Sequence, residues 1–540
     1  MLFNSGIFLL VFLPAALLGY YAFGMRGLRR GALGYLTLMS VVFYGWWNPV
    51  HVPLLLASMG ANYLLGRRLS QRPSQSLLIG GIITNILLLG YFKYSGFVVE
   101  TADQFLGVGW SMPHIVLPLA ISFFTFQQIA FLSDAYDGVA VDHDFLNYCL
   151  FVTFFPHLIA GPITHHKEML PQFADPAILR PRGEAMMVGA TLFVLGLFKK
   201  VIIADQIATF VGPAFEAAAS PNMALSLFPA WGGAIAYALQ IYFDFSGYSD
   251  MAIGLGLLFG ISLPPNFDSP YKARNIIEFW SRWHMTLTRF LTTYVYNPIT
   301  LRMTRARMRA GQPVPKRGRM TLGAFATLVA IPTIFTMFIS GVWHGAGWQF
   351  ILFGLLHGMF LTVAHGWHAL KARWRWPPDC FGWAGHAAAV LLTFGCVVIA
   401  LVPFRAPGMG VVLRFFSAMA GIDGAPIDWS FYETAGLHRL IDLLHLTPDT
   451  VSLFRLPQAI AIAGLLAMVW ILPNTQQWLR HYRTALNAKP GPSWLERWRI
   501  IPLAVWRPSL ACGIVVGMVS FFALARALSA APSEFLYFKF

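Results

Sequence analysis

Long apolar runs, separated by short polar and basic loops, recur along the whole chain. Many of these runs approach the length of about 20 residues that a helix needs to cross a bilayer, and we expect about 11 to 14 membrane elements. Backbone hydrogen bonds inside a membrane have to be made within each element, so the pattern predicts an all-α, polytopic helical membrane protein. The candidate spans are residues 5–24, 32–48, 51–66, 76–96, 114–133, 184–203, 224–243, 248–263, 320–341, 348–366, 384–403, 456–473 and 508–527.

Composition and the placement of charge agree with this prediction. Of the 540 residues, 57% are hydrophobic and 11% are charged, whereas a soluble protein has about 25% charged residues. The net charge of +15 comes largely from basic residues in short loops, the densest of which is Arg302–Arg319. By the positive-inside rule we expect these loops in the cytoplasm, which argues against nucleic acid as a partner. Between about residues 134 and 300 the crossings cannot be counted simply, which predicts re-entrant or interfacial elements.

The stretch Met320–Leu370 is apolar but rich in histidine. It contains no Lys, Arg, Asp or Glu, and its four histidines are His344, His357, His365 and His368. Polar side chains at membrane depth are costly and usually face a bundle interior or a wet cavity, so function is the first hypothesis for them. His344 lies among glycines and tryptophans between two apolar runs, and a neutral imidazole there could act as a general base. The alternative is a histidine that is hydrogen-bonded for helix packing.

Two apolar runs in the centre of the chain contain residues that interrupt a helix. The run Leu117–Gln128 includes a proline and the amide Gln127, and the run Phe154–Pro162 includes two prolines, a glycine and His157. Proline removes a helical donor, and broken backbone at membrane depth is tolerated where it lines a cavity within the protein. We therefore predict cavity-lining segments here, with the alternative that the prolines merely end short helices.

A third segment, residues 242–251, places the carboxylates of Asp244 and Asp250 in apolar surroundings. An uncompensated carboxylate at the bilayer centre costs about 2.5–3.5 kcal/mol, so each one needs a partner, a polar cavity or an interfacial position. We expect Asp250 to pair with Arg274, Arg282 or a histidine. The alternative is a helix–turn–helix at the membrane surface, capped by Asp244 and the nearby Ser246.

Residues 275–296 have the pattern of one amphipathic helix. Glu278 and Arg282 lie on its polar face, four residues apart in the favourable order. Such a helix is predicted to lie along the membrane interface rather than to cross it. His284 falls at the edge of the apolar stripe, where either a packing role or a direct role in chemistry fits. The stripe consists of Ile276, Trp280, Trp283, Leu287, Phe290 and Tyr294.

The sequence has no arrangement typical of a metal site or of a serine acyl-enzyme. There is no HExxH motif and no GxSxG elbow, and His365 and His368 suggest metal binding only weakly. The four cysteines are scattered without a CxxC motif, which excludes a disulfide framework. We expect no metal and no bound cofactor. The cysteines are Cys149, Cys380, Cys396 and Cys512.

Six segments, taken in order, resemble the membrane-bound O-acyltransferase family, and within it the bacterial membrane proteins that O-acetylate alginate and cellulose. The resemblance covers about residues 1–405, and six ordered motifs are far more specific than any one of them. The segments are Pro118–Asp137, Phe155–Pro162, Tyr242–Gly254, Pro264–Tyr271, Phe279–Leu287 (FWSRWHMTL) and Ser340–Gly358 (SGVWHGAGWQFILFGLLHG).

The resemblance implies a ring of transmembrane helices, with re-entrant and interfacial helices, around a central tunnel. The catalytic histidine of the family maps onto His344 in the WHG motif, and the second functional position maps onto His284 in the RWH motif. We expect residues 1–405 to form the membrane core, 406–455 a periplasmic segment, and 456–540 further transmembrane helices with a basic cytoplasmic loop. Further candidates for contact with substrate or tunnel are Asp250, Trp343, Trp348, His357, Arg282, Asn266, His157 and Gln127.

The implied activity is transfer of an acetyl group from a cytoplasmic donor, expected to be acetyl-CoA, across the bacterial inner membrane. The acceptor would be an exported polysaccharide such as alginate or cellulose, or a periplasmic acetyltransferase partner protein, with membrane lipid around the chain. Two other classes stay open from the residues. Broken helices and buried carboxylates also mark transporters and flippases, and the chain could be a non-catalytic scaffold of a polysaccharide export complex.

Overall fold

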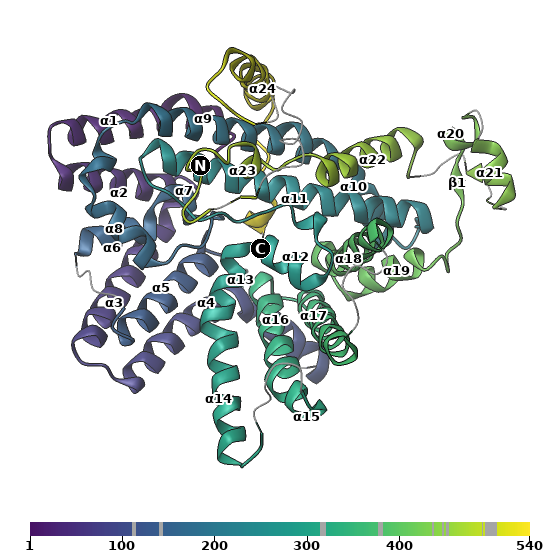
Figure 1. Cartoon of the computed structure of the whole chain (residues 1–540), viewed down its shortest axis with the longest axis horizontal. Coiled ribbons are helices and arrows are strands. Elements are labelled where there is room, and N and C mark those ends of the chain that lie inside the picture. The colour runs from purple at the N-terminus through teal and green to yellow at the C-terminus, as the bar shows by residue number, and fades with distance from the viewer. Residues whose placement is uncertain are drawn as a thin grey trace. The chain divides into compact units, whose positions relative to one another are not determined.

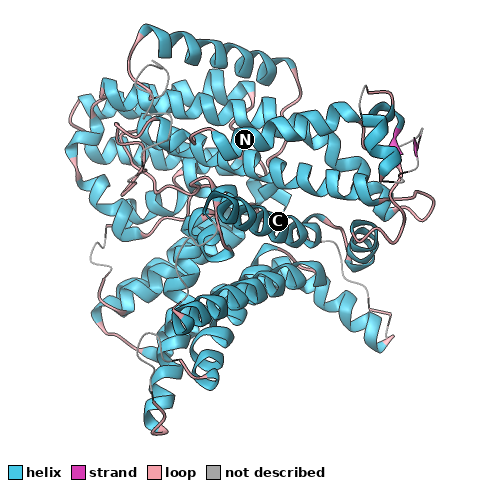
Figure 2. Ribbon diagram, turned by 45° about the vertical axis from the view of Figure 1, so that its right-hand side comes forward, coloured by secondary structure: helices cyan, strands magenta, loops and turns pink. Residues whose placement is uncertain are grey.

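The chain folds into helices almost throughout, as Figure 2 shows in the described part of the chain. The computed structural model describes all residues except 108, 111–114, 140–143, 314–319, 376–381, 435–436, 445, 447, 450–452, 489, 492–504 and 540. Extended structure in the described residues is limited to one parallel pair of two-residue strands, β1 (Ile427–Asp428) and β2 (Pro448–Asp449). The prediction of an all-α fold is confirmed.

The described residues form two units that interleave along the sequence. Unit 1 contains residues 1–202, 245–266 and 475–540, and unit 2 contains residues 203–244 and 267–474. One boundary falls inside the π-helical turn η4 (Lys199–Ala204), and another falls inside the long helix α11 (Leu227–Leu258). The domain ranges expected from the sequence stay a prediction.

Unit 1 is built on the N-terminal helices and on the second half of α11 (Figure 1). Phenylalanine rings from its first helices pack together, and the Phe12 and Phe155 ring centroids lie 5.3 Å apart. Its other elements are η1 (Phe8–Phe12), α1 (Leu13–Met25), α2 (Arg29–Gly45), η2 (Pro49–His51), α3 (Val52–Gln71), α4 (Gln75–Leu106), α5 (Ile121–Tyr136), α6 (Phe145–Thr153), α7 (Phe155–Leu158), α8 (His166–Ala174), η3 (Pro176–Leu179), α9 (Gly183–Phe198), α23 (Thr475–Trp478), α24 (Leu510–Ser529) and η9 (Leu536–Lys539).

Unit 2 contains the histidine-rich helices. Helices α16 and α17 lie side by side, and α18 packs against α17 (Figure 1). The elements are α10 (Asp205–Ala219), the first half of α11, η5 (Pro270–Lys272), α12 (Ile276–Arg282), α13 (Met285–Leu291), η6 (Thr292–Tyr296), α14 (Asn297–Arg309), α15 (Leu322–Phe325), η7 (Ala326–Ala330), α16 (Ile331–His344), α17 (Trp348–Trp374), α18 (Gly382–Arg405), α19 (Met409–Met419), α20 (Trp429–Tyr432), α21 (Leu437–Leu443) and α22 (Leu456–Ile471).

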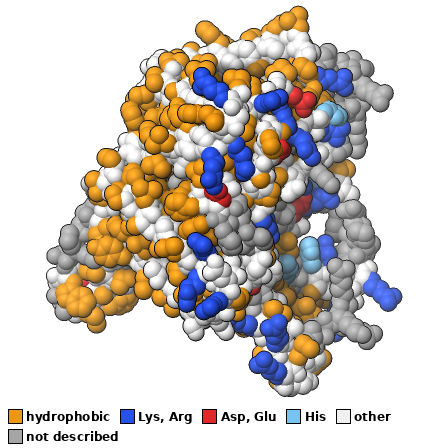
Figure 3. Space-filling model, turned by 90° about the vertical axis from the view of Figure 1, so that its left-hand side faces the viewer, with side chains coloured by type: hydrophobic (Ala, Val, Ile, Leu, Met, Phe, Trp, Pro, Cys, Tyr) orange, Lys and Arg blue, Asp and Glu red, His pale blue; other side chains and the backbone are white. Residues whose placement is uncertain are grey.

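Seven helical stretches among the described residues are long and apolar enough to cross a membrane, so the chain is a multi-pass membrane protein. The other predicted spans fall on helices that are shorter, such as α2 and α22, or more polar. Figure 3 shows hydrophobic side chains spread over one face of the molecule, as lipid contact requires. The seven stretches are Phe8–Met25, Gln75–Leu106, Gly183–Ala219, Leu322–His344, Trp348–Trp374, Gly382–Arg405 and Leu510–Ser529.

The prediction of two separate spans at 224–243 and 248–263 is wrong, because α11 is one continuous helix. Its glycines let the helix pack closely on α9. A Cβ atom at Gly247 would lie 2.8 Å from the Gly196 carbonyl oxygen, and one at Gly254 would lie 2.5 Å from that of Gly189. Glycines spaced by seven residues on α9 and α11 therefore let the two backbones approach closely, as small residues do between membrane helices.

The alternative of a capped helix–turn–helix in this segment is also wrong. Asp244 and Ser246 lie buried within α11 rather than at a helix end. The predicted span 114–133 begins later, at Ile121, and residues 111–114 lie outside the described part of the chain. Also outside it are Cys380, residues 314–319 of the basic loop, and several residues of the segment 406–455.

Candidate active site

His344 is enclosed by aromatic rings in unit 2. It is the last residue of α16, its exposed fraction is 3%, and its ring centroid lies 4.8 Å from that of Trp343. Phe404 of α18 lies 5.0 Å away and Phe353 of α17 lies 5.6 Å away, both roughly edge-on to the imidazole. We call the rings of Trp343, Phe353 and Phe404 the aromatic pocket. It keeps water away from an imidazole that three different helices hold in place.

Glycines bring the helices around His344 into close contact. A Cβ atom at Gly341 would lie 2.3 Å from the Phe350 carbonyl oxygen, and one at Gly354 would lie 2.3 Å from that of Met337. A Cβ atom at Gly345 would lie 2.2 Å from the ring of Phe350. Only glycine fits at such distances, so the glycines allow a close backbone approach between α16 and α17.

His357 lies four residues after Phe353 on α17, and the Phe353 ring lies next to the rings of both His344 and His357. The centroids of Phe353 and His357 are 4.7 Å apart, and the Trp280 indole donates a hydrogen bond to His357 Nδ1 at 3.3 Å. A neutral His357 whose Nδ1 accepts this bond carries its proton on Nε2. The side chain thus joins α12 to α17 through a fixed tautomer.

His284 lies at a sharp break in the chain, which the sequence did not predict. The single amphipathic helix expected over 275–296 is wrong, because α12 ends at Arg282 and α13 begins at Met285. His284 has φ 42° and ψ 52°, in the left-handed region. This conformation costs a residue other than glycine about 1–2 kcal/mol, and residues held in it are concentrated at functional sites.

The same break buries His284 completely and directs it to the rings around His344. Its exposed fraction is 0%, and its ring centroid lies 6.3 Å from that of Trp343. Burial lowers the pKa of His284 to about 3, so its imidazole is neutral at physiological pH. The rings of His284 and His344 therefore both lie next to the ring of Trp343.

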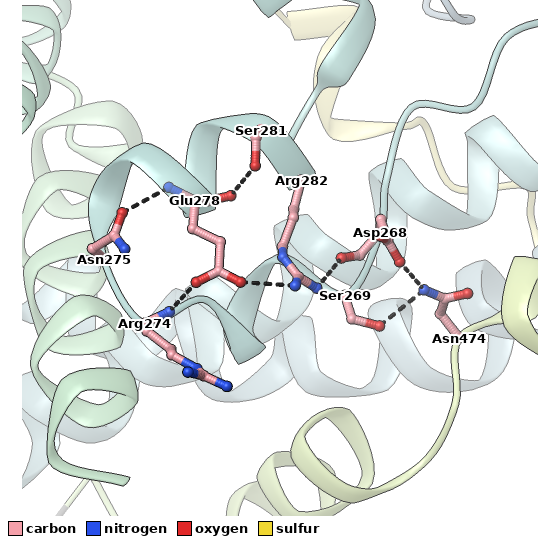
Figure 4. Close-up of polar contacts among 8 residues, drawn as sticks. All are labelled: Asp268, Ser269, Arg274, Asn275, Glu278, Ser281, Arg282 and Asn474. Atoms are coloured by element: carbon pink, nitrogen blue, oxygen red, sulfur yellow. Dashed lines mark hydrogen bonds and ion pairs between the residues drawn. The ribbon is translucent and has the colours of Figure 1, made fainter. Parts of the chain in front are cut away.

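Arg282 belongs to a polar network that holds α12 (Figure 4). Its guanidinium forms an ion pair with Glu278 at 2.7 Å and donates to the Asp268 carbonyl oxygen at 3.2 Å. The Asn474 amide donates to Asp268 Oδ1 at 2.8 Å and to Ser269 Oγ at 2.9 Å. The predicted contact between Glu278 and Arg282 is confirmed. The network fixes the end of α12 two residues before His284.

Asp250 has a different partner from those expected. In unit 1 its Oδ2 lies 2.6 Å from Lys199 Nζ, and the Thr475 hydroxyl donates to the same oxygen at 2.7 Å. Lys199 also donates to the Thr475 oxygen at 2.7 Å, which closes a three-membered network. The expectation that Asp250 pairs with Arg274, Arg282 or a histidine is wrong for the ion pair that it forms, because a lysine 51 residues earlier in η4 faces this turn of α11.

Three other candidates also lie in unit 1. The Gln127 amide nitrogen is 3.2 Å from His157 Nδ1, and both residues are buried, Gln127 within the continuous helix α5 and His157 within the short helix α7. Burial lowers the pKa of His157 to about 3. Asn266, buried in the loop after α11, donates to Ser249 Oγ at 3.2 Å. Each of these contacts joins two segments of unit 1.

A small cavity of about 320 Å³ lies beside the two-helix break in unit 2. Trp280 and Thr288 line it from α12 and α13, Thr336 lines it from α16, and His365 lines it from α17. The His284 carbonyl accepts a hydrogen bond from the Thr288 backbone at 3.1 Å, so this wall begins directly at the break. Trp348, at the start of α17, is 47% exposed and does not line this cavity.

Sequence reasoning missed two groups that matter here. Phe404 closes the aromatic pocket from α18, yet one phenylalanine in an apolar span carries no distinguishing pattern. Lys199 could have been found, because the Lys199–Lys200 pair interrupts an apolar run and a buried lysine needs a partner. Within the described residues, no group of three His, Cys, Asp or Glu side chains could hold a metal ion.

The sequence of this chain is similar to those of known membrane proteins. The model of the membrane-bound O-acyltransferase family matches residues 136–310, which include the break at His284. The peptidoglycan O-acetyltransferase of Helicobacter pylori is 38% identical over 461 residues, which cover 79% of this chain and 81% of the relative.

Two further relatives extend the comparison. The probable alginate O-acetylase AlgI of Pseudomonas aeruginosa is 36% identical, over 78% of this chain and 75% of its own length. The teichoic acid D-alanyltransferase of Bacillus subtilis is 24% identical, over 74% of this chain and 98% of its own. With a helical membrane fold and relatives that are named as acyl-transferring proteins, the chain belongs to the membrane-bound O-acyltransferase family and is an acyltransferase.

Proposed function

We propose that this protein transfers an acetyl group from a cytoplasmic thioester donor, acetyl-CoA, to a hydroxyl group of an exported polysaccharide or of its periplasmic carrier protein. The observation that carries the proposal is the enclosure of His344, because an imidazole within the aromatic pocket at a membrane helix end is suited to chemistry without water. The relatives named for acetylation of peptidoglycan and alginate support an extracytoplasmic polymer as acceptor.

In this proposal His344 acts as the general base. Its neutral imidazole accepts the proton of the acceptor hydroxyl while that oxygen attacks the thioester carbonyl carbon. The C–S bond then breaks, the acetyl ester forms, and the thiol leaves with the proton that His344 returns. General base catalysis of this kind contributes a factor of about 10² to 10⁴ in rate.

We assign His284 a positioning role for the donor. Its buried, neutral ring lies beside Trp343, and the cavity that begins at Thr288 is lined by hydroxyl groups that can donate hydrogen bonds to a thioester or amide oxygen. A neutral imidazole can donate one hydrogen bond and accept one, which suits the orientation of a carbonyl group. The tunnel expected from the family resemblance and the location in the bacterial inner membrane are part of the same proposal.

The test is the acetate content of the exported polymer in cells that produce His344→Ala at the normal protein level. We expect acetate to fall to the level of a strain without the protein. His51→Ala, at a half-buried histidine of η2, is the matched control and should leave acetate unchanged. Full acetylation in the His344→Ala strain would overturn the assignment of the base. Consumption of acetyl-CoA by the purified wild-type protein and an acceptor, without an ion gradient, separates this function from transport.

A further inference from the structure

A large open groove lies on unit 2, away from the aromatic pocket residues. Its volume is about 730 Å³, and its walls are α17, α18 and the start of α12. One end of the groove is apolar and is formed by Met359, Phe360, Val363 and Leu392. None of the residues assigned to catalysis lines this groove.

The other end of the groove is cationic. His368 and Lys371 of α17 and His386 of α18 line it, and no Asp or Glu belongs to the described lining of the groove. Arg274 also lines the groove from the start of α12, and its backbone nitrogen donates to the Glu278 carboxylate (Figure 4). The groove therefore presents positive charge at one end and hydrocarbon at the other, which is the pattern of an anionic amphiphile.

Exposed tryptophans lie beside the cationic end. Trp367 of α17 lines the groove and is 44% exposed, Trp374 is 58% exposed, and Trp383 near the start of α18 is 85% exposed. The Lys371 ammonium lies 5.4 Å from the centre of the Trp367 ring. Tryptophan and lysine at the same level of two adjacent membrane helices indicate the level of the lipid headgroups.

The length of the groove matches one leaflet. Its lining on α17 extends from Met359 to Lys371, a rise of about 18 Å at about 1.5 Å per residue. Half of a hydrocarbon core about 30 Å thick is about 15 Å. The cationic end therefore lies at headgroup level when the apolar end reaches the middle of the bilayer. The basic residues Lys371, Arg373 and Arg375 place this end in the cytoplasmic leaflet by the positive-inside rule, where anionic lipids attract basic segments.

We propose that this groove binds one acidic phospholipid of the cytoplasmic leaflet, with its phosphate at Lys371 and an acyl chain along α17 and α18. The lipid is a ligand of the folded protein, and its binding does not depend on the assignment of the catalytic base. The Lys371 ammonium contributes about a fivefold increase in affinity for an anionic headgroup.

The experiment uses the full chain, purified in a neutral detergent and freed of lipid. A phosphatidylglycerol with a photoreactive group in its acyl chain is the probe, and the crosslinked peptides are identified by mass spectrometry. We expect crosslinks on α17 and α18, with phosphatidylglycerol competing about fivefold better than phosphatidylcholine. The variant Lys371→Ala should bind about fivefold more weakly. Ala389→Trp, which places a large ring in the groove, should remove the crosslink while Lys371 remains.

Arg373→Ala is the matched control, because this residue lies on α17 but does not line the groove. It should bind the probe like the wild type, and melting temperatures confirm that each variant is folded. Equal competition by phosphatidylcholine, or unchanged binding in both groove variants, would overturn the proposal. Displacement of the probe by millimolar coenzyme A or by inorganic phosphate would also overturn it, because the groove would then bind a soluble phosphate compound rather than a lipid.

Discussion

The Asp250 network of unit 1 and the aromatic pocket of unit 2 both bury a titratable side chain, and they do so in different ways. Asp250 is surrounded by polar partners, with Lys199 Nζ at 2.6 Å and the Thr475 hydroxyl at 2.7 Å. His344 is instead enclosed by aromatic rings, with the ring centroids of Trp343, Phe353 and Phe404 within 5.6 Å. The first arrangement compensates a charge, and the second encloses an imidazole in an apolar pocket.

The difference shows how a buried polar residue in a membrane protein can be interpreted. A buried carboxylate that forms an ion pair has a structural role, and removal of its partner leaves an uncompensated charge. For an imidazole that aromatic side chains enclose at membrane depth, function is the first hypothesis. Four predictions test this contrast, beginning with the largest expected effect.

His344→Gln should separate chemistry from stability. The replacement is neutral, polar and similar in volume, so we expect the free energy of unfolding to change by less than about 1.5 kcal/mol. Acetyl transfer should fall by a factor of about 10² to 10⁴, since the general base is lost. Transfer rate and melting temperature are measured on the same purified sample. A rate above one tenth of the wild-type value would contradict the contrast.

Lys199→Ala should give the opposite result. Asp250 would remain buried without its cation, and we expect a loss of about 3–5 kcal/mol in the free energy of unfolding. Replacement of both partners, Lys199→Met with Asp250→Leu, should recover most of this loss because no charge remains to be compensated. Thermal unfolding in detergent provides the measurement. A double variant as unstable as the single one would show that the ion pair is not the cause.

Gly341→Ala should destabilise the contact between α16 and α17. The added methyl group would lie 2.3 Å from the Phe350 carbonyl oxygen, and overpacking of this kind costs about 1–3 kcal/mol. Gly395→Ala on α18 is the matched control, because no atom lies within 4 Å of the added group. We expect the control to be neutral or slightly more stable in thermal unfolding. Equal melting temperatures for the two variants would remove the case for a glycine-dependent approach.

His157 should make stability depend on pH. Burial lowers its pKa from 6.5 to about 3, so the folded chain binds fewer protons than the unfolded chain between these values. The contribution of His157 to the free energy of unfolding is fully present above about pH 6.5. It decreases as the pH falls towards 3, by up to about 1.4 kcal/mol per pH unit. His157→Gln should have a shallower decrease in melting temperature from pH 7.5 to 5. Parallel curves for the two proteins would count against a buried neutral imidazole.

Much of the fold follows from the hydrophobic pattern, because span length and apolar composition are local properties. The helical hairpin at His344 was predicted on this basis, and it is present as α16 and α17. The continuity of α11 was not predictable from polarity, because two aspartates interrupt its apolar sequence, and its close packing on α9 depends on glycine contacts. Likewise, the partner of Asp250 comes from Lys199 and Thr475, which lie far away in the sequence.

The local geometry of the candidate site was the least predictable part. Helical periodicity places the stripe from Ile276 to Tyr294 on one face, and that pattern does not indicate the helix break at His284. The family resemblance identified His284 as a candidate, whereas its left-handed backbone and its contact with Trp343 emerge only from tertiary packing.

The backbone at His284 has a consequence for mutagenesis and for sequence comparison. Position 284 combines a left-handed backbone with a buried imidazole, so a replacement there changes the backbone preference and the side chain together. Alanine would remove the ring and strain the corner together, while glycine removes the ring and relaxes the corner. Glycine is therefore the informative replacement for the imidazole, and asparagine, which tolerates the same dihedral angles, is the natural probe of whether a smaller polar group suffices.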